Sequence, residues 1–169
     1  MSEAQTRKNI IDKRLLEAGW NASDPSHVIS EHEVLHQHAN VAGIGYSDYI
    51  LLGKDGVPLA VVEAKKSTTD AEKGREQARQ YANGLQKMYG VRPFIFYTNG
   101  YDIYFWDETL GPPRKVYGFF TREDLETKKY QNDHRRPLST SLIDENIVNC
   151  IRPRKTETTG HLKLRGQTT

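Results

Sequence analysis

The feature that most constrains the fold of this chain is a turn between two apolar runs. The dipeptide Asp55-Gly56 lies between residues 49–52 and residues 59–62, which are both apolar. Asp-Gly flanked by such runs is the strongest short-range signal for a β-hairpin. A two-residue loop at Asp55-Gly56 and a four-residue loop over residues 54–57 give the same strand pairing. The sequence therefore predicts two antiparallel strands with a single register.

That register brings two carboxylates together. With Ile50 opposite Val61, Asp48 faces Glu63, and their Cβ atoms lie roughly 4.5–5.5 Å apart. Like charges repel at this spacing, whereas a divalent cation between them is stabilising, because such cations prefer carboxylate oxygens. Lys65 lies on the same strand face as Glu63, where an ammonium stabilises a phosphate charge or holds an attacking water. The alternative is a solvated cluster in which Lys65 only neutralises Glu63.

Composition sets outer limits on the function. The chain has 169 residues, a hydrophobic fraction of 36% and a formal net charge of +2, which fits one domain and neither requires nor excludes nucleic-acid binding. Cys150 is the single cysteine, so we expect neither a disulfide nor a cysteine-based zinc site. No apolar run is long enough to span a membrane, and the first residues lack a signal-peptide pattern. We expect a cytoplasmic protein without membrane contact.

Hydrophobic periodicity and turn residues predict an alternating order of elements. The pattern indicates a helix over 3–19, a strand over 27–35, the hairpin, a helix over 71–89, strands over 94–97, 101–106 and 114–120, and a helix over 121–130. Asn99-Gly100 predicts a type I′ turn. The helix over 71–89 carries an apolar stripe, made of Ala78, Tyr81, Ala82, Leu85, Met88 and Tyr89. This order is typical of a mixed sheet flanked by helices.

Several further residues are candidates for the same site. Gln77 and Tyr81 are four residues apart and share one face of the helix that follows the hairpin. They are either site residues, or a surface glutamine and a core tyrosine. A third acid is available from Glu31 or Glu33 on the first strand, or from Glu3 on the first helix, and the spacing does not choose among them.

These residues carry a resemblance to a known family. Asp48 followed by Glu63-Ala64-Lys65 resembles the D…(D/E)xK signature of the restriction-endonuclease-like nuclease superfamily, whose core is αβββαβ. More specifically, residues 3–135 resemble the N-terminal endonuclease domain of the restriction subunit of type I restriction–modification enzymes. The segments that carry this resemblance, in order, are EAQTRKNIIDKRLLEAGW, SDYILL, AVVEAKK, QARQY and YTNGYDIYFWD.

The resemblance implies a mechanism and partners. It implies a DNA endonuclease that uses Mg²⁺, with Mn²⁺ as a substitute, and double-stranded DNA as substrate. It implies modification and specificity subunits as partners, and ATP used only by a motor domain absent from this chain. The implied metal ligands are Asp48, Glu63 and the Ala64 carbonyl, and the implied catalytic lysine is Lys65. The implied DNA contacts are Gln77, Tyr81 and Lys66.

The resemblance also divides the chain. We expect a nuclease domain over residues 1–132, a connector toward a motor over 133–150, and a disordered tail over 151–169, which suggests a fragment or a truncated relative. The sequence has no GxxxxGK[ST] phosphate-binding loop. Two other functions stay open: a non-catalytic module that docks on DNA or on other subunits, and a stand-alone nuclease that acts on branched or modified DNA.

Overall fold

The computed structural model describes residues 2–35 and 44–136. The chain divides into two compact units, Met1–His134 and Arg135–Thr169. All helices and strands described below belong to the first unit. The predicted connector over 133–150 and the predicted tail over 151–169 lie almost wholly outside the described residues.

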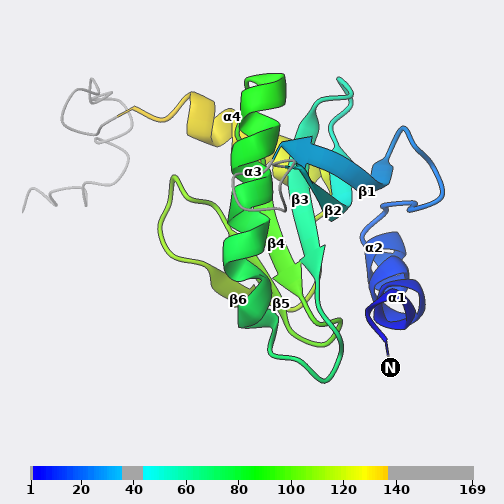
Figure 1. Ribbon diagram of the computed structural model, residues 1–169. Coiled ribbons are helices and arrows are strands. Elements are labelled where there is room, and N and C mark those ends of the chain that lie inside the picture. Colours follow the sequence, from blue (N-terminus) through cyan, green and yellow to red (C-terminus); the bar gives the residue numbers. More distant parts are fainter. Residues whose placement is uncertain (1, 36–43, 137–169) are drawn as a thin grey trace, which may run out of the picture. The chain divides into compact units, whose positions relative to one another are not determined.

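The described residues build one six-stranded mixed sheet, which lies between helices (Figure 1). The strands follow the sheet in sequence order, and only the β3–β4 pair is parallel. This arrangement confirms the predicted mixed sheet and αβββαβ order. The strands are β1 (Val28–Leu35), β2 (Ile44–Leu52), β3 (Pro58–Ala64), β4 (Phe94–Thr98), β5 (Ile103–Trp106) and β6 (Arg114–Val116).

The helices connect and cover this sheet. The segment predicted as one helix over 3–19 has a π-helical turn in its middle and ends at Glu17. Gly19 follows shortly after, and its φ of +83° suits a glycine after a helix. Between β3 and β4 the chain crosses over through a helix, as a parallel strand pair requires. The helices are α1 (Glu3–Thr6), η1 (Arg7–Ile11), α2 (Asp12–Glu17), η2 (Ala71–Gly74), α3 (Arg75–Tyr89) and α4 (Arg122–Asp133).

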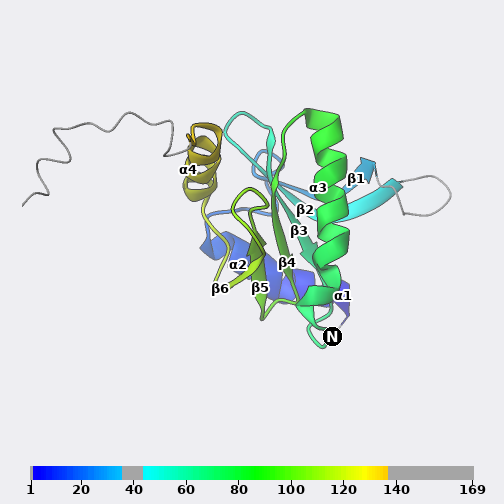
Figure 2. The same ribbon diagram turned by 90° about the vertical axis from the view of Figure 1, so that its left-hand side faces the viewer.

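Each face of the sheet has its own hydrophobic core. On one face, Ala78, Tyr81 and Leu85 of α3 pack on Ile50, Val61 and Ile95. On the other face, Leu15 of α2 and Leu125 of α4 belong to a cluster around Tyr49 and Phe96. Figure 2 shows α3 on one side of the strands, with α2 and α4 on the other. Met88 and Tyr89 do not belong to the packed stripe, contrary to prediction. Both are 42% exposed, in the last turn of α3.

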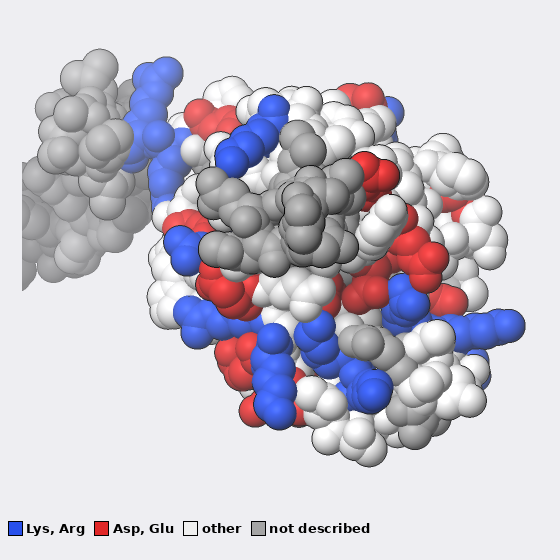
Figure 3. All heavy atoms as spheres, viewed as in Figure 1, with Lys and Arg blue, Asp and Glu red and all other residues white. Residues whose placement is uncertain are grey.

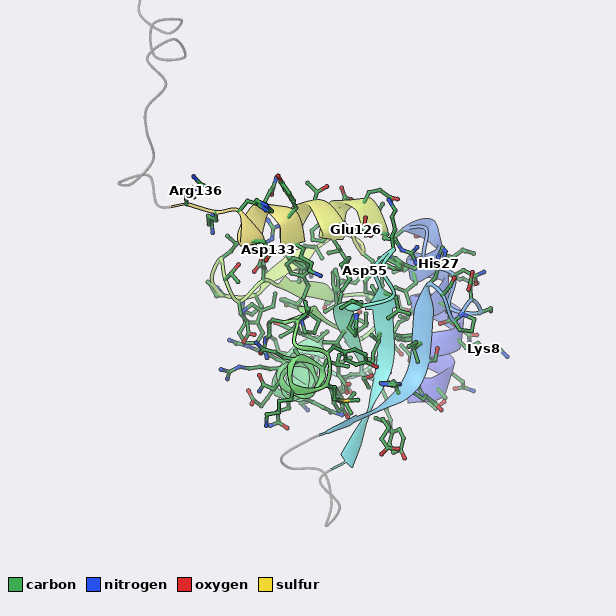
Figure 4. All side chains as sticks on the ribbon, turned by 90° about the horizontal axis from the view of Figure 1, so that it is seen from above. Lys8, His27, Asp55, Glu126, Asp133 and Arg136 are labelled. Atoms are coloured by element: carbon green, nitrogen blue, oxygen red, sulfur yellow. The ribbon has the colours of Figure 1, made fainter. Side chains whose placement is uncertain are left out.

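The β2–β3 loop differs from both predicted loops. Leu52 pairs with Pro58, and the Gly53 amide donates to the Val57 carbonyl at 2.9 Å, so three residues form the loop. Its last residue, Gly56, has a φ of +74°, the left-handed conformation that closes three-residue hairpin loops. The loop lies against α4, where the Lys54 amide donates to Glu126 Oε1 at 2.9 Å; Figure 4 shows Glu126 close to Asp55.

A β-bulge restores the predicted pairing beyond this loop. The register shifts between Leu51 and Leu52, because Leu51 pairs with Ala60 while Leu52 pairs with Pro58. Leu59 is therefore an extra residue on β3. The shorter loop and the extra residue cancel, and Ile50 pairs with Val61 as predicted.

The β4–β5 connection is not the predicted type I′ turn. Such a turn requires positive φ at both central residues, and here Gly100 has a φ of +91° while Asn99 does not have a positive φ. The Asn99 side chain takes over the connection instead. Its Oδ1 accepts hydrogen bonds from the Tyr101 and Asp102 amides at 3.1 and 2.8 Å, and its Nδ2 donates to the Thr69 carbonyl at 2.8 Å. The turn is thus tied to the loop that follows β3.

Candidate active site

The predicted acids lie at the end of β3, on neighbouring strands. Tyr49 pairs with Val62, and the register carried one residue further places Asp48 opposite Glu63. Charges gather here because the apolar part of β3 ends at this point, next to the parallel strand β4. The Lys65 amide continues the pairing by donating to the Thr98 carbonyl at 2.8 Å.

Asp48 is held by two donors from different elements. Its Oδ2 accepts a hydrogen bond from the Ala64 amide at 2.7 Å, which fixes the carboxylate against the backbone between Glu63 and Lys65. Its Oδ1 accepts from Arg7 Nη1, also at 2.7 Å. The Asp48 side chain is only 15% exposed. A carboxylate held in this way has a fixed orientation before any ligand arrives.

Glu63, Lys65, Gln77 and Tyr81 form one chain of hydrogen bonds. Lys65 Nζ lies 2.7 Å from Glu63 Oε1 and 2.7 Å from Gln77 Oε1. Gln77 Nε2 donates to the Tyr81 hydroxyl at 2.8 Å. Burial, together with the Glu63 charge, raises the pKa of Tyr81, although the bond from Gln77 opposes this. The tyrosine therefore stays a neutral hydroxyl at ordinary pH.

Burial sets how strongly these contacts act. Glu63 is 2% exposed and the Lys65 side chain 19%, so their ion pair lies in a poorly hydrated region. An ion pair that is kept from water is screened less than one at the surface. Removing Lys65 would leave a buried carboxylate without its main compensating charge, which is costly. The structure thus brings four predicted site residues together beside Asp48.

Gly74 also belongs to this site, although the sequence analysis did not single it out. It ends η2 and lies directly over the acid–lysine pair. A Cβ placed on it would lie 3.2 Å from Glu63 Cγ and 3.4 Å from Lys65 Cγ and Cε. Its φ of −85° suits any residue, so the close approach, not the backbone, favours glycine here. A lone glycine within a polar segment gives no sequence signal of such a contact.

Arg7 is the second residue that sequence reasoning missed. Its guanidinium contacts Asp48 Oδ1 and, through Nη2, Glu31 Oε1 at 3.2 Å. Burial lowers the pKa of Arg7, but the nearby Asp48 and Glu31 charges outweigh burial, so this pKa lies above its ordinary value. The residue lies 41 positions before Asp48. No local spacing rule connects two residues so far apart.

The three candidates for a third acid differ in position. Ser30 pairs with Tyr49 and His32 with Ser47, so Glu31 lies opposite Asp48 and next to the site. Glu33 is exposed and pairs with Tyr46, two residue pairs further along. Glu3 begins α1, and its side chain lies outside the described part. Lys66 follows β3 and is exposed.

The donors at this site fit a hard divalent cation. Two carboxylates, on Asp48 and Glu63, lie near the Ala64 backbone, and oxygen ligands of this kind suit Mg²⁺, which keeps several waters when bound. Among residues 2–35 and 44–136, no group of three His, Cys, Asp or Glu side chains is arranged to hold a metal. A metal here would therefore be held by two carboxylates, a carbonyl and water.

The face of the molecule that carries α3 has charges of both signs. Figure 3 shows basic and acidic side chains interspersed on this face, with no single sign covering it. Some of this mixing is paired, as between Arg79 and Glu108 at 3.1 Å. Positively charged residues at the described site itself, such as Lys65 and Arg7, are engaged with acids. Any phosphate contact would depend on a few local groups.

The fold and the site together define a class of protein. A mixed sheet with a parallel β3–β4 pair, a crossover helix, and an acid–acid–lysine set at the end of β3 is the restriction-endonuclease-like arrangement. Residues 27–114 match the family described as "Type I restriction enzyme R protein N terminus". The chain belongs to this family.

Two relatives agree with this assignment. The type I restriction enzyme EcoAI endonuclease subunit of Escherichia coli is 30% identical over 116 residues, which cover 64% of this chain and 14% of that subunit. A solved fragment assigned to an HsdR subunit of a type I restriction enzyme from Vibrio vulnificus YJ016 is 25% identical. Its TM-score is 0.63, and the match covers 80% of this chain and 27% of that one.

These relatives are much longer than the chain described here, which corresponds to only a small part of each. In the ranges that the structure describes, no helix is long and apolar enough to cross a membrane.

Proposed function

We propose that this chain is a Mg²⁺-dependent DNA endonuclease domain that works within a type I restriction–modification system. The observation that carries the proposal is the hydrogen-bonded chain from Glu63 through Lys65 and Gln77 to Tyr81, next to Asp48. These five residues come from three elements, and the fold brings them to one place at the end of β3. A solvated surface cluster would not be buried or connected in this way.

Each residue has a separate role in the proposal. Asp48, Glu63 and the Ala64 carbonyl would hold Mg²⁺, or Mn²⁺ in its place. Such an ion would supply Lewis-acid chemistry at the scissile phosphate and at a bound water molecule. Lys65, which bridges Glu63 and Gln77, is placed to stabilise negative charge on the phosphate or to orient the water.

The remaining residues contact the substrate. Gln77 and Tyr81 lie on the first half of α3, and we assign them to the backbone of double-stranded DNA. Exposed Lys66 adds a phosphate contact. No group among the described site residues is arranged to distinguish bases, so we assign sequence recognition to a separate specificity subunit. Modification subunits and an ATP-driven motor domain complete the proposed assembly, which we place in the cytoplasm.

The metal site is tested first by calorimetry. Mg²⁺ and Mn²⁺ are titrated into the wild type, Asp48→Asn and Glu63→Gln, each with and without a short DNA duplex. We expect the wild type to bind and both variants to lose binding, because each loses one anionic ligand. Glu76→Gln is the matched control: Glu76 is an exposed acid on α3, and its loss should leave the affinity unchanged.

A non-catalytic docking module is the second candidate. Arg7 and Lys65 already neutralise Asp48 and Glu63, which is how a site that needs no metal would also be stabilised. If the wild type binds no metal, even with DNA present, this candidate replaces the endonuclease. If metal binds and DNA is cleaved by the chain alone, the stand-alone nuclease takes the place of the motor-linked enzyme.

A further inference from the structure

The strand register forms a row of three acids across the sheet. The register of the neighbouring residue pairs places Glu31 on β1 opposite Asp48 on β2, and Asp48 opposite Glu63 at the end of β3. Like charges on directly opposite positions repel, so the row requires positive charge beside it. Among the described residues, Lys65 and Arg7 supply positive charge at this row. Lys65 contacts Glu63, and Arg7 contacts both Asp48 and Glu31.

The two cations differ in origin. Lys65 belongs to the D…(D/E)xK signature and lies two residues from the acid that it contacts. Arg7 comes from the N-terminal helical segment, outside the residues 27–114 that match the family. Its Asp48 contact, at 2.7 Å with both side chains mostly buried, is the stronger of its two. Glu31 is 69% exposed, and exposed ion pairs contribute little.

Arg7 and Glu31, the two partners of the weaker contact, both lie in irregular backbone. Arg7 begins the π-helical turn η1, and π-turns within helices occur frequently at functional sites. Glu31 has a φ of +51°, and among the described residues it is the only non-glycine residue with a positive φ. Such a conformation is strained and persists only where the surrounding structure holds it. One distortion thus lies in the backbone of Arg7 itself, and the other in the backbone of Glu31, whose carboxylate contacts the Arg7 guanidinium.

The helical segment itself is anchored on both sides of Arg7. Thr6 Oγ1 accepts a hydrogen bond from the Ser67 amide at 3.2 Å, and Asp12 Oδ1 accepts one from the Tyr49 hydroxyl at 2.7 Å. The backbone around Arg7 is therefore fixed, whereas its long side chain has space beside it. A hollow of about 440 Å³ is lined by Arg7, Glu31, Tyr46, Ser47 and Asp48. Open space therefore adjoins the guanidinium next to its contact with Asp48.

From these contacts we infer that Arg7 is an exchangeable counter-ion of Asp48, which competes with the divalent cation for this carboxylate. The inference rests on the proposed function, because it concerns the same metal site. A guanidinium and a divalent cation repel each other when both lie within a few ångströms of one carboxylate. Metal entry therefore requires the Arg7 side chain to move from Asp48 into the adjoining hollow. Arg7 keeps the site closed to metal until that exchange takes place.

The test is the affinity for Mg²⁺ and Mn²⁺ of Arg7→Gln compared with the wild type, by calorimetry on the full chain. We expect the dissociation constant to fall about tenfold in the variant, a coupling of ordinary size between two ligands of one site. Lys8→Gln is the matched control. Lys8 is exposed and extends outward from the same segment (Figure 4). The substitution Lys8→Gln removes the same charge as Arg7→Gln, and it should change the affinity for metal less than about twofold.

Other outcomes overturn the inference in distinguishable ways. If the wild type binds metal and Arg7→Gln binds it equally well or more weakly, Arg7 holds Asp48 in place instead of competing, and the metal site still stands. If neither protein binds metal, with or without DNA, the competition and the proposed metal site fall together. Arg7→Met, which keeps the apolar stem, replaces Arg7→Gln should the latter not fold.

Discussion

At the scale of single residues, the site contains some residues that local sequence rules predict and others that can be identified only in the folded chain. Asp48, Glu63 and Lys65 follow from the pairing of one hairpin and from strand alternation. Gln77 and Tyr81 follow from helical spacing. Arg7 and Gly74 follow from none of these, because they reach the site through contacts between elements that are distant in sequence. A sequence pattern carries no record of which distant side chain neutralises an acid.

Gly74 offers a direct test of how tightly this site is packed. In Gly74→Ala the new methyl would lie 3.2 Å from Glu63 Cγ, which is closer than ordinary contact. We expect a loss of about 1–3 kcal/mol in the free energy of unfolding, the usual cost of overpacking, and weaker metal binding as Glu63 shifts. Urea unfolding and calorimetry measure the two effects.

Gly118→Ala is the control for that experiment. A Cβ at Gly118 would meet nothing within 4 Å, and its backbone is not left-handed. This variant should be neutral or slightly stabilised, because alanine reduces the freedom of the unfolded chain. Equal behaviour of the two variants would show that Gly74 has no special contact with Glu63 and Lys65.

At the scale of elements, the hairpin shows how a correct register can come from an incorrect loop. The Asp-Gly signal places the turn correctly, but it does not specify the loop length. The bulge at Leu59 lies on β3 outside the turn, and no turn residue signals it. Without that extra residue, the three-residue loop would shift the pairing by one position and move Glu63 to the opposite face.

The loop type can be tested at Gly56. This residue has a φ of +74°, and a Cβ there would meet nothing within 4 Å, so only the backbone conformation disfavours other residues. We expect Gly56→Ala to lose about 1–2 kcal/mol of unfolding free energy, the cost of a left-handed alanine. Gly56→Asn should lose clearly less, since asparagine tolerates this conformation. Chemical denaturation of both variants measures the difference, and equal losses would argue against the left-handed loop.

At the scale of the whole molecule, the order of elements was the most predictable property. Each element is defined by its own periodicity, and the parallel β3–β4 pair follows from the helix between them. The π-helical turn and the positive φ of Glu31 are not predictable, because no residue type or spacing in these segments signals either one. The chain matches only 14% of the length of its Escherichia coli relative, so the activity of the complete assembly belongs to the proposal.

The two units of the chain lead to a prediction about stability. Among the residues that the structure describes, both hydrophobic cores are made of residues before His134, and the last of them in sequence is Leu125, which is fully buried. A chain that ends at His134 should therefore unfold with the same urea midpoint and slope as the full chain, because the slope follows the surface exposed on unfolding. Trp20, buried and bonded to the Phe120 carbonyl at 2.8 Å, provides the fluorescence signal.

A second truncation, after Phe120, serves as the contrast. It keeps Trp20 and its partner but removes α4, and with it Leu125 and the Glu126 contact to the hairpin loop. Loss of a fully buried leucine alone costs about 2–5 kcal/mol, so this shorter chain should unfold at a much lower midpoint. A lower midpoint already in the chain that ends at His134 would mean that residues 135–169 contribute to the fold. That result would move the boundary of the first unit toward the C-terminus.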